Sequence, residues 1–292
     1  MKKILTLILM LATLGHSASL VAQDAKSPKT DTNTEVFLQK LRAYYLKRAS
    51  ALKFAHDNDA AKPFTLEQKP VLTWTSTGDG LWSGDVFVWA AEGRPQVIGC
   101  IGSWPINDET RGVFEELQSI STTPLAETDL DESLKWHSES PGITLLEIPE
   151  AGPPAGDARR RLSQMRRLTD RIKSHMRINN ANEELRLLTQ PVYRYSGESS
   201  TVVDGAVFAY VTTAGTDPEV LLLLECHKTG DNLKWYYAPV RFTHRELWMT
   251  LDESEVWRVG NHVTPYRTAV ITDSYLSRPT APVSIDEVKA LQ

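Results

Sequence analysis

Apolar residues along this chain follow two spacings, one typical of helices and one typical of strands. From Glu35 to about Ala55 they recur every three or four positions, which predicts a long amphipathic helix. The stretch from Gly156 to Met176 has the same spacing, and Asp157 is a suitable N-cap for it. Strand-like segments follow each predicted helix. They cover 71–75, 85–91, 96–101, 114–121 and 143–148 after the first helix, and 192–195, 206–212, 219–226, 235–242 and 268–272 after the second.

Short turns separate these predicted strands. Gly, Asp and Pro cluster at 77–80 and 92–95 in the first series, and at 214–218 and 229–232 in the second. Links of this length require antiparallel neighbours, because a parallel crossover needs a dozen or more residues. The run 220–224 is apolar on both faces, which predicts a central strand covered on both sides.

The two halves of the chain share residues at a fixed offset of 121 positions. Gly84 corresponds to Gly205, and the segment 130–133 has the same sequence as 251–254. The shared residues are mostly apolar or turn-forming, which indicates a repeated fold. We therefore predict an α+β fold made by tandem duplication. Each unit would be one long helix packed on an antiparallel sheet of about five strands, with the units related by a pseudo-two-fold axis and in contact through their remaining sheet faces.

The first residues have the pattern of a secretory signal peptide. Lys2 and Lys3 precede an apolar run at 4–14, and small residues follow. The run is well short of the roughly 20 residues that span a bilayer. We therefore expect cleavage, a periplasmic or extracellular location and no transmembrane segment in the mature chain. The predicted segments are a signal peptide at 1–22, a flexible leader at 23–32, repeat unit 1 at 33–153, repeat unit 2 at 154–276 and a C-terminal tail at 277–292.

The composition is that of an ordinary folded chain. The 292 residues have a formal net charge of -5, with 41% hydrophobic and 24% charged residues, which argues against a disordered protein. The sequence has no specific nucleic-acid-binding signature. Its two cysteines, Cys100 and Cys226, fit either two free buried thiols or one disulfide.

Three stretches, 161–168, 185–195 and 217–225, resemble an uncharacterised family of exported bacterial proteins with no assigned function. The resemblance lies mainly within 157–260. It implies an exported protein and assigns no catalytic residue.

Local motifs for catalysis, metal binding and phosphate binding are missing from the sequence, so we predict no metal site and no cofactor. A catalytic triad assembled from distant residues would leave no such motif. His137 and His227 stand beside acidic residues, where a histidine acts as a general base or metal ligand, or simply lies on a surface loop.

Two aromatic pairs, Phe87/Trp89 and Phe208/Tyr210, lie at corresponding positions of the two halves. Within each pair the residues are two apart on a predicted strand, so they share one face. In an exposed cleft such a face would stack on sugar rings or apolar side chains, but we expect these residues to lie in the core.

Both predicted helices are basic, although the chain is acidic. The second helix region is rich in arginine, and this charge would suit either a solvated face or binding of a polyanionic or cell-surface partner. The candidate polyanion-binding residues are Arg159, Arg160, Arg166, Arg167, Arg171 and Arg177.

The hypothesis that the sequence favours is an exported non-catalytic binding or structural protein with an unknown ligand. One alternative is an exported hydrolase with a site in the groove between the two units, using a non-repeated histidine and a carboxylate. Another is a protein that binds polyanions or anionic surfaces through the basic helix of unit 2. Because the repeated residues are those expected of a fold, any specific activity is expected among residues that do not recur.

Overall fold

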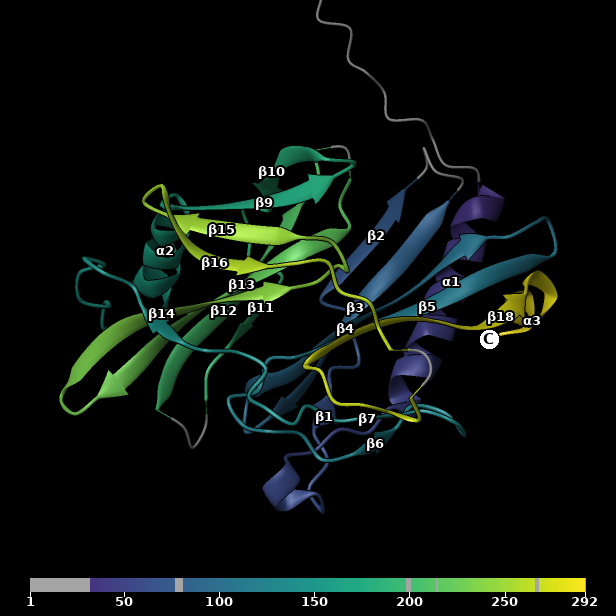
Figure 1. The fold of residues 1–292 in the computed structure, drawn as a ribbon, viewed down its shortest axis with the longest axis horizontal. Coiled ribbons are helices and arrows are strands. Elements are labelled where there is room, and N and C mark those ends of the chain that lie inside the picture. The colour runs from purple at the N-terminus through teal and green to yellow at the C-terminus, as the bar shows by residue number, and fades with distance from the viewer. Residues whose placement is uncertain (1–31, 77–80, 198–200, 214, 266–267, 292) are drawn as a thin grey trace, which may run out of the picture.

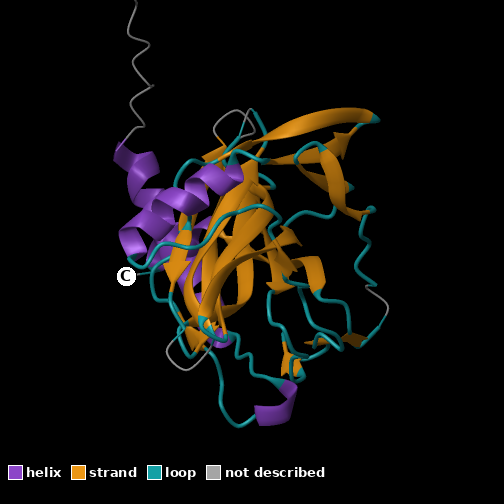
Figure 2. Cartoon of the chain, turned by 90° about the vertical axis from the view of Figure 1, so that its left-hand side faces the viewer, coloured by secondary structure: helices purple, strands orange, loops and turns teal. Residues whose placement is uncertain are grey.

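Strands are the predominant element of this protein (Figure 1). The computed structural model describes residues 32–76, 81–197, 201–213, 215–265 and 268–291. The predicted signal peptide and most of the leader lie outside this part of the chain. The described residues contain three α-helices and one 3-10 turn, and Figure 2 shows the helices at the margin of a molecule made mainly of strands. These elements are α1 (Thr32–Ala51), η1 (Asp57–Asp59), α2 (Ala158–Thr169) and α3 (Ile285–Ala290).

The first sheet has six strands in the order β1-β3-β4-β5-β18, with β2 also paired to β3. All of these pairs are antiparallel. The residues of the predicted C-terminal tail form most of β18, and α3 follows it. The strands are β1 (Thr65–Leu66), β2 (Leu72–Ser76), β3 (Trp82–Ala91), β4 (Arg94–Pro105), β5 (Thr110–Ser119) and β18 (Tyr275–Ser284).

The second sheet has nine strands in the order β16-β15-β9-β10-β12-β13-β14-β8, with β11 also paired to β12. These strands are β8 (Leu146–Glu147), β9 (Ile172–Ile178), β10 (Ala181–Leu187), β11 (Tyr193–Tyr195), β12 (Val202–Val211), β13 (Pro218–Thr229), β14 (Asn232–Arg241), β15 (Leu247–Leu251) and β16 (Ser254–Val259). A third, small sheet contains β6 (Thr128–Asp129), β7 (Lys135–Trp136) and β17 (Val270–Ile271).

The predicted α+β fold, with one long helix on a sheet in each unit, is wrong. α2 ends at Thr169, and the following residues form strand β9, which pairs with both β10 and β15. The segment satisfies two periods at once, because Ile172 and Met176 are four positions apart and also alternate with exposed Lys173 along a strand. The segment forms a strand because its backbone pairs with both β10 and β15.

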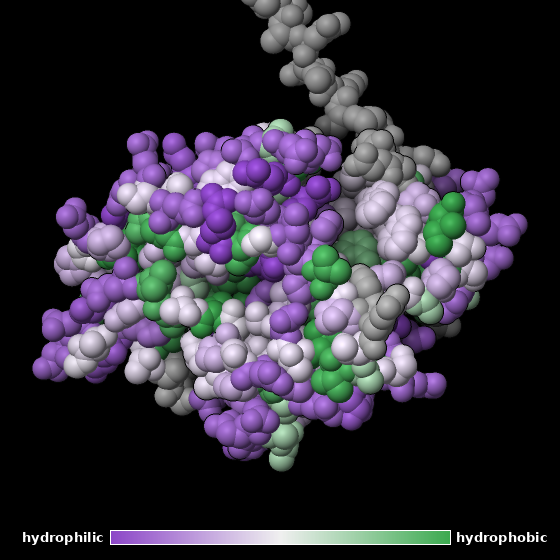
Figure 3. All heavy atoms as spheres, in the orientation of Figure 1, coloured by the Kyte–Doolittle hydropathy of each residue, from purple (hydrophilic) through white to green (hydrophobic). Residues whose placement is uncertain are grey.

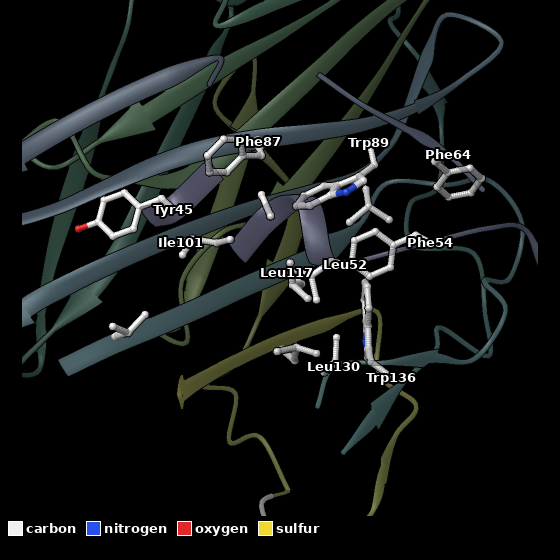
Figure 4. Packing of buried hydrophobic residues seen from close by; sticks show 14 of the residues in the cluster. Tyr45, Leu52, Phe54, Phe64, Phe87, Trp89, Ile101, Leu117, Leu130 and Trp136 are labelled. Atoms are coloured by element: carbon white, nitrogen blue, oxygen red, sulfur yellow. The ribbon is translucent and has the colours of Figure 1, made fainter. Parts of the chain in front are cut away.

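α1 packs on the outer face of the first sheet (Figure 1, right). Its buried residues Leu41, Tyr45 and Ala49 recur every fourth position and join Phe87 and Trp89 in one hydrophobic cluster, part of which Figure 4 shows. Phe208 and Tyr210 are buried on the outer face of the second sheet in a separate cluster with residues of α2. The interpretation of both aromatic pairs as core is confirmed.

The inner faces of the two sheets pack against each other. Val86 and Val88 of β3 and Val207 and Ala209 of β12 belong to one buried cluster that contains residues of both sheets. We call this interface the seam. It also contains Cys100, whereas Cys226 lies on the outer face of the second sheet, and both cysteines are free and buried.

Strand pairing recurs at corresponding positions of the two halves. β3 pairs with β4 as β12 pairs with β13, and the β-bulge between Trp89 and Ala90 recurs between Tyr210 and Val211. The halves differ where the first half has η1 and the second continues as the β9–β10 hairpin, whose turn residues Asn179 and Asn180 both have positive φ. Among the described residues no helix is long and apolar enough to cross a membrane.

Candidate functional site

A pocket of about 410 Å³ opens at one end of the seam. It lies between the end of β4, the start of β13 and the segment that links β14 to β15, so both sheets contribute to its wall. We call this region the open end. Its lining residues are Trp82, Trp104, Phe114, Glu116, Asp217, Glu219, Phe242, Thr243, His244, Arg245, Ser277, Arg278 and Pro279.

Three aromatic rings of the first sheet form one wall of the pocket. Trp82 and Trp104 are stacked, with ring centroids 5.5 Å apart and an interplanar angle of 23°. The Phe114 ring lies 6.5 Å from Trp82 and 6.3 Å from Trp104. Trp82 is 39% exposed although it is large and apolar, so this wall presents aromatic surface to the pocket.

Two glycines hold these rings flat against the strands. Gly112 pairs with Trp104, and Gly102 pairs with Phe114, across β4 and β5. A Cβ atom would lie 2.3 Å from the Trp104 ring if built on Gly112, and 2.4 Å from the Phe114 ring if built on Gly102. The rings therefore occupy the space that side chains would need, and the backbone fixes their orientation.

Three carboxyl groups also line the pocket, and both sheets contribute to this set. Glu116 belongs to β5 and accepts a hydrogen bond of 2.8 Å from the Tyr275 hydroxyl, while Asp217 and Glu219 lie at the start of β13. Burial raises the pKa of Glu116 and that of Glu219, each to about 7. Burial also raises the pKa of Asp217 well above its usual value, and the neighbouring Glu219 and Glu116 add to this shift.

The three basic residues of the pocket, Arg278, Arg245 and His244, differ in what they interact with. Arg278 is buried and bound to Glu115, with its Nε and Nη2 atoms 3.0 and 2.7 Å from Glu115 Oε2. Arg245 acts on Glu219 electrostatically and lowers its pKa, against the larger effect of burial. Partial burial lowers the pKa of His244, and the charge of Arg245 contributes, which favours the neutral imidazole.

The other end of the seam is filled by a buried ion pair, and we call it the closed end. Arg94 begins β4 and donates from Nε to Glu225 Oε1 at 2.9 Å, across the two sheets. Tyr195 donates to the same oxygen at 2.6 Å, and His227 Nε2 lies 2.6 Å from Glu225 Oε2. Burial acts to raise the pKa of Glu225, but the bond from His227 and the charge of Arg94 outweigh it and lower this pKa.

The histidines singled out in the sequence lie outside the pocket. His227 belongs to the closed end, where its Nδ1 is 3.4 Å from the Thr201 hydroxyl oxygen. His137 Nε2 is 3.7 Å from Glu139 Oε1. His244 is the histidine that lines the pocket, and the sequence analysis assigned it no role.

The candidate polyanion-binding arginines lie on different elements. Arg159, Arg160 and Arg167 are exposed on α2, and Arg166 on the same helix bonds to Gln190. Arg171 follows the helix and is 2.5 Å from Asp252. Arg177 is on β9, 3.2 Å from Glu246, and hydrophilic side chains crowd the surface over β9, β15 and β16 (Figure 3). Polyanion binding by these residues stays a prediction.

The sequence analysis missed every residue of the aromatic wall. A usable signal exists, because Gly102 and Trp104 are two apart on one strand and Gly112 and Phe114 are two apart on the next. In an antiparallel pair this places each aromatic residue opposite a glycine. The pocket carboxyls carry no such signal, since their burial depends on the second sheet.

A comparison of this chain with known protein families, with curated proteins and with solved structures found no match. In the part of the chain that the structure describes, no three His, Cys, Asp or Glu side chains are grouped so that they could hold a metal ion.

Proposed function

We propose that this protein is an exported, non-catalytic binding protein that holds a small organic ligand in the pocket at the open end of the seam. The observation that carries this proposal is the aromatic wall of Trp82, Trp104 and Phe114, which lines a cavity of about 410 Å³. Small-molecule sites typically have volumes of roughly 300–1,000 Å³, and this pocket falls within that range. Export rests on the signal-peptide pattern of residues 1–22.

The wall favours binding because its rings need no rearrangement to receive a flat ligand. Gly102 and Gly112 keep Phe114 and Trp104 flat against the strands whether or not a ligand is present. A pre-formed site loses less conformational entropy on binding than one that must be assembled. The residues concerned differ between the two halves, as expected for an activity acquired on a repeated frame.

The proposal can be tested by saturation-transfer NMR with a mixed library of small amines, carboxylic acids, sugars and nucleosides. We expect at least one class to bind, and Trp82→Ala to weaken that binding about tenfold through loss of stacking surface. Trp248→Ala is the matched control, because Trp248 also stacks on a neighbouring ring, that of His175, but lies outside the pocket. If no compound binds, or if both variants weaken binding equally, the proposal is wrong.

A second candidate function is hydrolysis at the same pocket. His244 and Glu219 both line it, which provides the non-repeated histidine and carboxylate that a hydrolase in the groove would need. A neutral imidazole and a carboxylic acid with a pKa of about 7 are suitable as general base and general acid. The same NMR samples distinguish the two functions, since a hydrolase would convert a bound compound over hours and His244→Ala would stop the conversion.

A further inference from the structure

The two ends of the seam occupy corresponding positions of the repeated strand frame. β3 pairs Gly84 with Gly102, and β12 pairs Gly205 with Glu225. Since Gly84 and Gly205 correspond, Gly102 stands where the second half has Glu225. By the same register Trp104 stands in place of His227.

A basic residue of the closed end, Arg94, and an acidic residue of the open end, Asp217, also occupy corresponding positions of the two halves. Arg94 and Asp217 each come directly before a proline, Pro95 or Pro218, that pairs next to the recurring β-bulge. Asp217 is therefore the counterpart of Arg94. The closed end has a guanidinium at this position, and the open end has a carboxyl group.

Because these corresponding residues differ, an ion pair fills the closed end, whereas a pocket remains at the open end. At the closed end the chain supplies its own cation, which enters between Glu225 and the carbonyl oxygens of Pro95 and Ile120. At the open end Phe114 covers Gly102, and the pocket lies beside Asp217. The open end thus combines three carboxyl groups with an aromatic wall. Of its two arginines, Arg278 is already bound to Glu115, and Arg245 acts on Glu219 through its charge.

We propose that the ligand of this pocket is a small organic cation, an amine, amidine or guanidine with a flat apolar body. The flat body would stack on the wall of Trp82 and Trp104, and the cationic group would pair with the carboxylates of Asp217, Glu116 and Glu219. Aromatic faces attract cations, and the three carboxyl groups outnumber Arg245, the pocket arginine that Glu115 does not bind, so a cationic ligand would gain a carboxylate partner here. This inference rests on the proposed function and specifies its substrate class.

Three probes of nearly identical shape isolate the effect of charge: benzamidine, which is a cation, benzamide, which is neutral, and benzoate, which is an anion. Their binding to the full-length protein is measured by titration calorimetry at about pH 8, where carboxyl groups with a pKa of about 7 are ionised. We expect benzamidine to bind at least tenfold more tightly than benzamide, and benzoate to bind more weakly than either. Benzamide binding at least as tight as that of benzamidine would overturn the inference.

Substitution of the acids tests the pairing itself. Asp217→Asn should weaken benzamidine binding at least tenfold and leave benzamide binding unchanged, and Glu219→Gln provides the same test if the first variant does not fold. Asp231→Asn is the control, since Asp231 is exposed in the turn between β13 and β14. Unchanged benzamidine binding in both pocket variants would also overturn the inference.

The two proposals fail in different ways. If benzamide or benzoate binds best and Trp82→Ala removes that binding, the pocket is a ligand site but not one for cations. If none of the three probes binds and the mixed library gives no ligand either, the proposed function itself is wrong.

Discussion

Burial acts to raise the pKa of carboxyl groups at both ends of the seam, yet the resulting pKa values move in opposite directions. Glu225 is fully buried and its pKa is lowered, because Arg94 and His227 bind its oxygens. Glu116 and Glu219 are half-buried in the pocket wall, and their pKa values rise to about 7. The difference shows that the partner, and not burial alone, decides the charge state of a carboxyl group in this interface.

This contrast has a consequence for stability at the two ends. At the closed end Arg94, Tyr195 and His227 all bind the Glu225 carboxylate, although Arg94 Nη2 is buried without a hydrogen-bond partner among the described residues. The open end holds carboxyl groups that are more stable when protonated. The closed end should therefore contribute to the stability of the fold, and the open end should lower it above about pH 7, where Glu116 and Glu219 become ionised.

The largest expected effect is at the closed end. Glu225→Ala leaves the Arg94 guanidinium buried without its carboxylate, so we expect a loss of about 3–5 kcal/mol in the free energy of unfolding. Urea denaturation followed by tryptophan fluorescence measures this loss. The double substitution Arg94→Met and Glu225→Leu should restore most of the stability, since it removes both charges.

The matched control is the ion pair of Lys234 with Glu147, at 2.9 Å and about half exposed on both sides. Lys234→Ala should cost no more than about 0.5 kcal/mol, because water screens this pair. If Glu225→Ala costs as little as Lys234→Ala, the closed end is not the stabilising network described above.

Much of the strand frame, the first helix and the Asp157 N-cap of the second helix could be predicted from the sequence, but the end of the second helix could not. The offset between Gly84 and Gly205 correctly aligns strands because turns and alternating apolar residues act locally. The segment after α2 was misassigned because Ile172 and Met176 satisfy both periods, and pairing with distant β15 decided between them. The consecutive residues Asn179 and Asn180 were a hairpin signal that the sequence analysis did not use.

The second prediction concerns Gly102, the glycine against which the Phe114 ring of the aromatic wall packs. Gly102→Ala places a Cβ atom 2.4 Å from the Phe114 ring and 2.7 Å from the Ser83 carbonyl oxygen. The ring must move away from the wall, so we expect a loss of about 1–3 kcal/mol in stability and a change in the near-UV circular dichroism of the stacked tryptophans. Urea denaturation and the near-UV spectrum measure the two effects.

Gly156→Ala is the control for this substitution, because no atom lies within 4 Å of a Cβ built there. It should change stability by less than about 0.5 kcal/mol and leave the spectrum unaltered. Equal effects of the two substitutions would show that the Phe114 ring is not held by Gly102.

The candidate site was less accessible to sequence reasoning than the frame. The glycine partners of Trp104 and Phe114 can be predicted from their spacing in the sequence. The position of Glu116 in the pocket cannot, because it depends on how β18 and the second sheet pack around it. The arrangement of two sheets face to face depends on the sum of many apolar contacts. No local sequence pattern around Glu116 or Asp217 predicts which sheet will pack over that residue.

The smallest expected effect is a pH dependence of stability at the open end. An acid whose pKa is raised on folding, as Glu116 is from 4.5 to about 7, binds more protons in the folded state between these pH values. Stability is therefore lost as the pH rises through this window, and Glu116→Gln should remove the loss. The neighbouring groups that act on Glu116 are Tyr275, Ser277 and Glu219.

Urea denaturation of both proteins at about pH 5 and pH 8 measures this term. Relative to the unsubstituted protein, Glu116→Gln should gain about 1–2 kcal/mol at pH 8 compared with pH 5, because the glutamine has no charge to desolvate. Glu109→Gln, at an exposed carboxylate, should show no such gain. Glu225→Gln should show no such gain between pH 5 and pH 8, since the pKa of Glu225 is lowered from 4.5 and its contribution is lost only as the pH falls below that value. An equal gain for Glu116→Gln and Glu225→Gln would mean that the two ends do not differ in how they affect the charge of a carboxyl group.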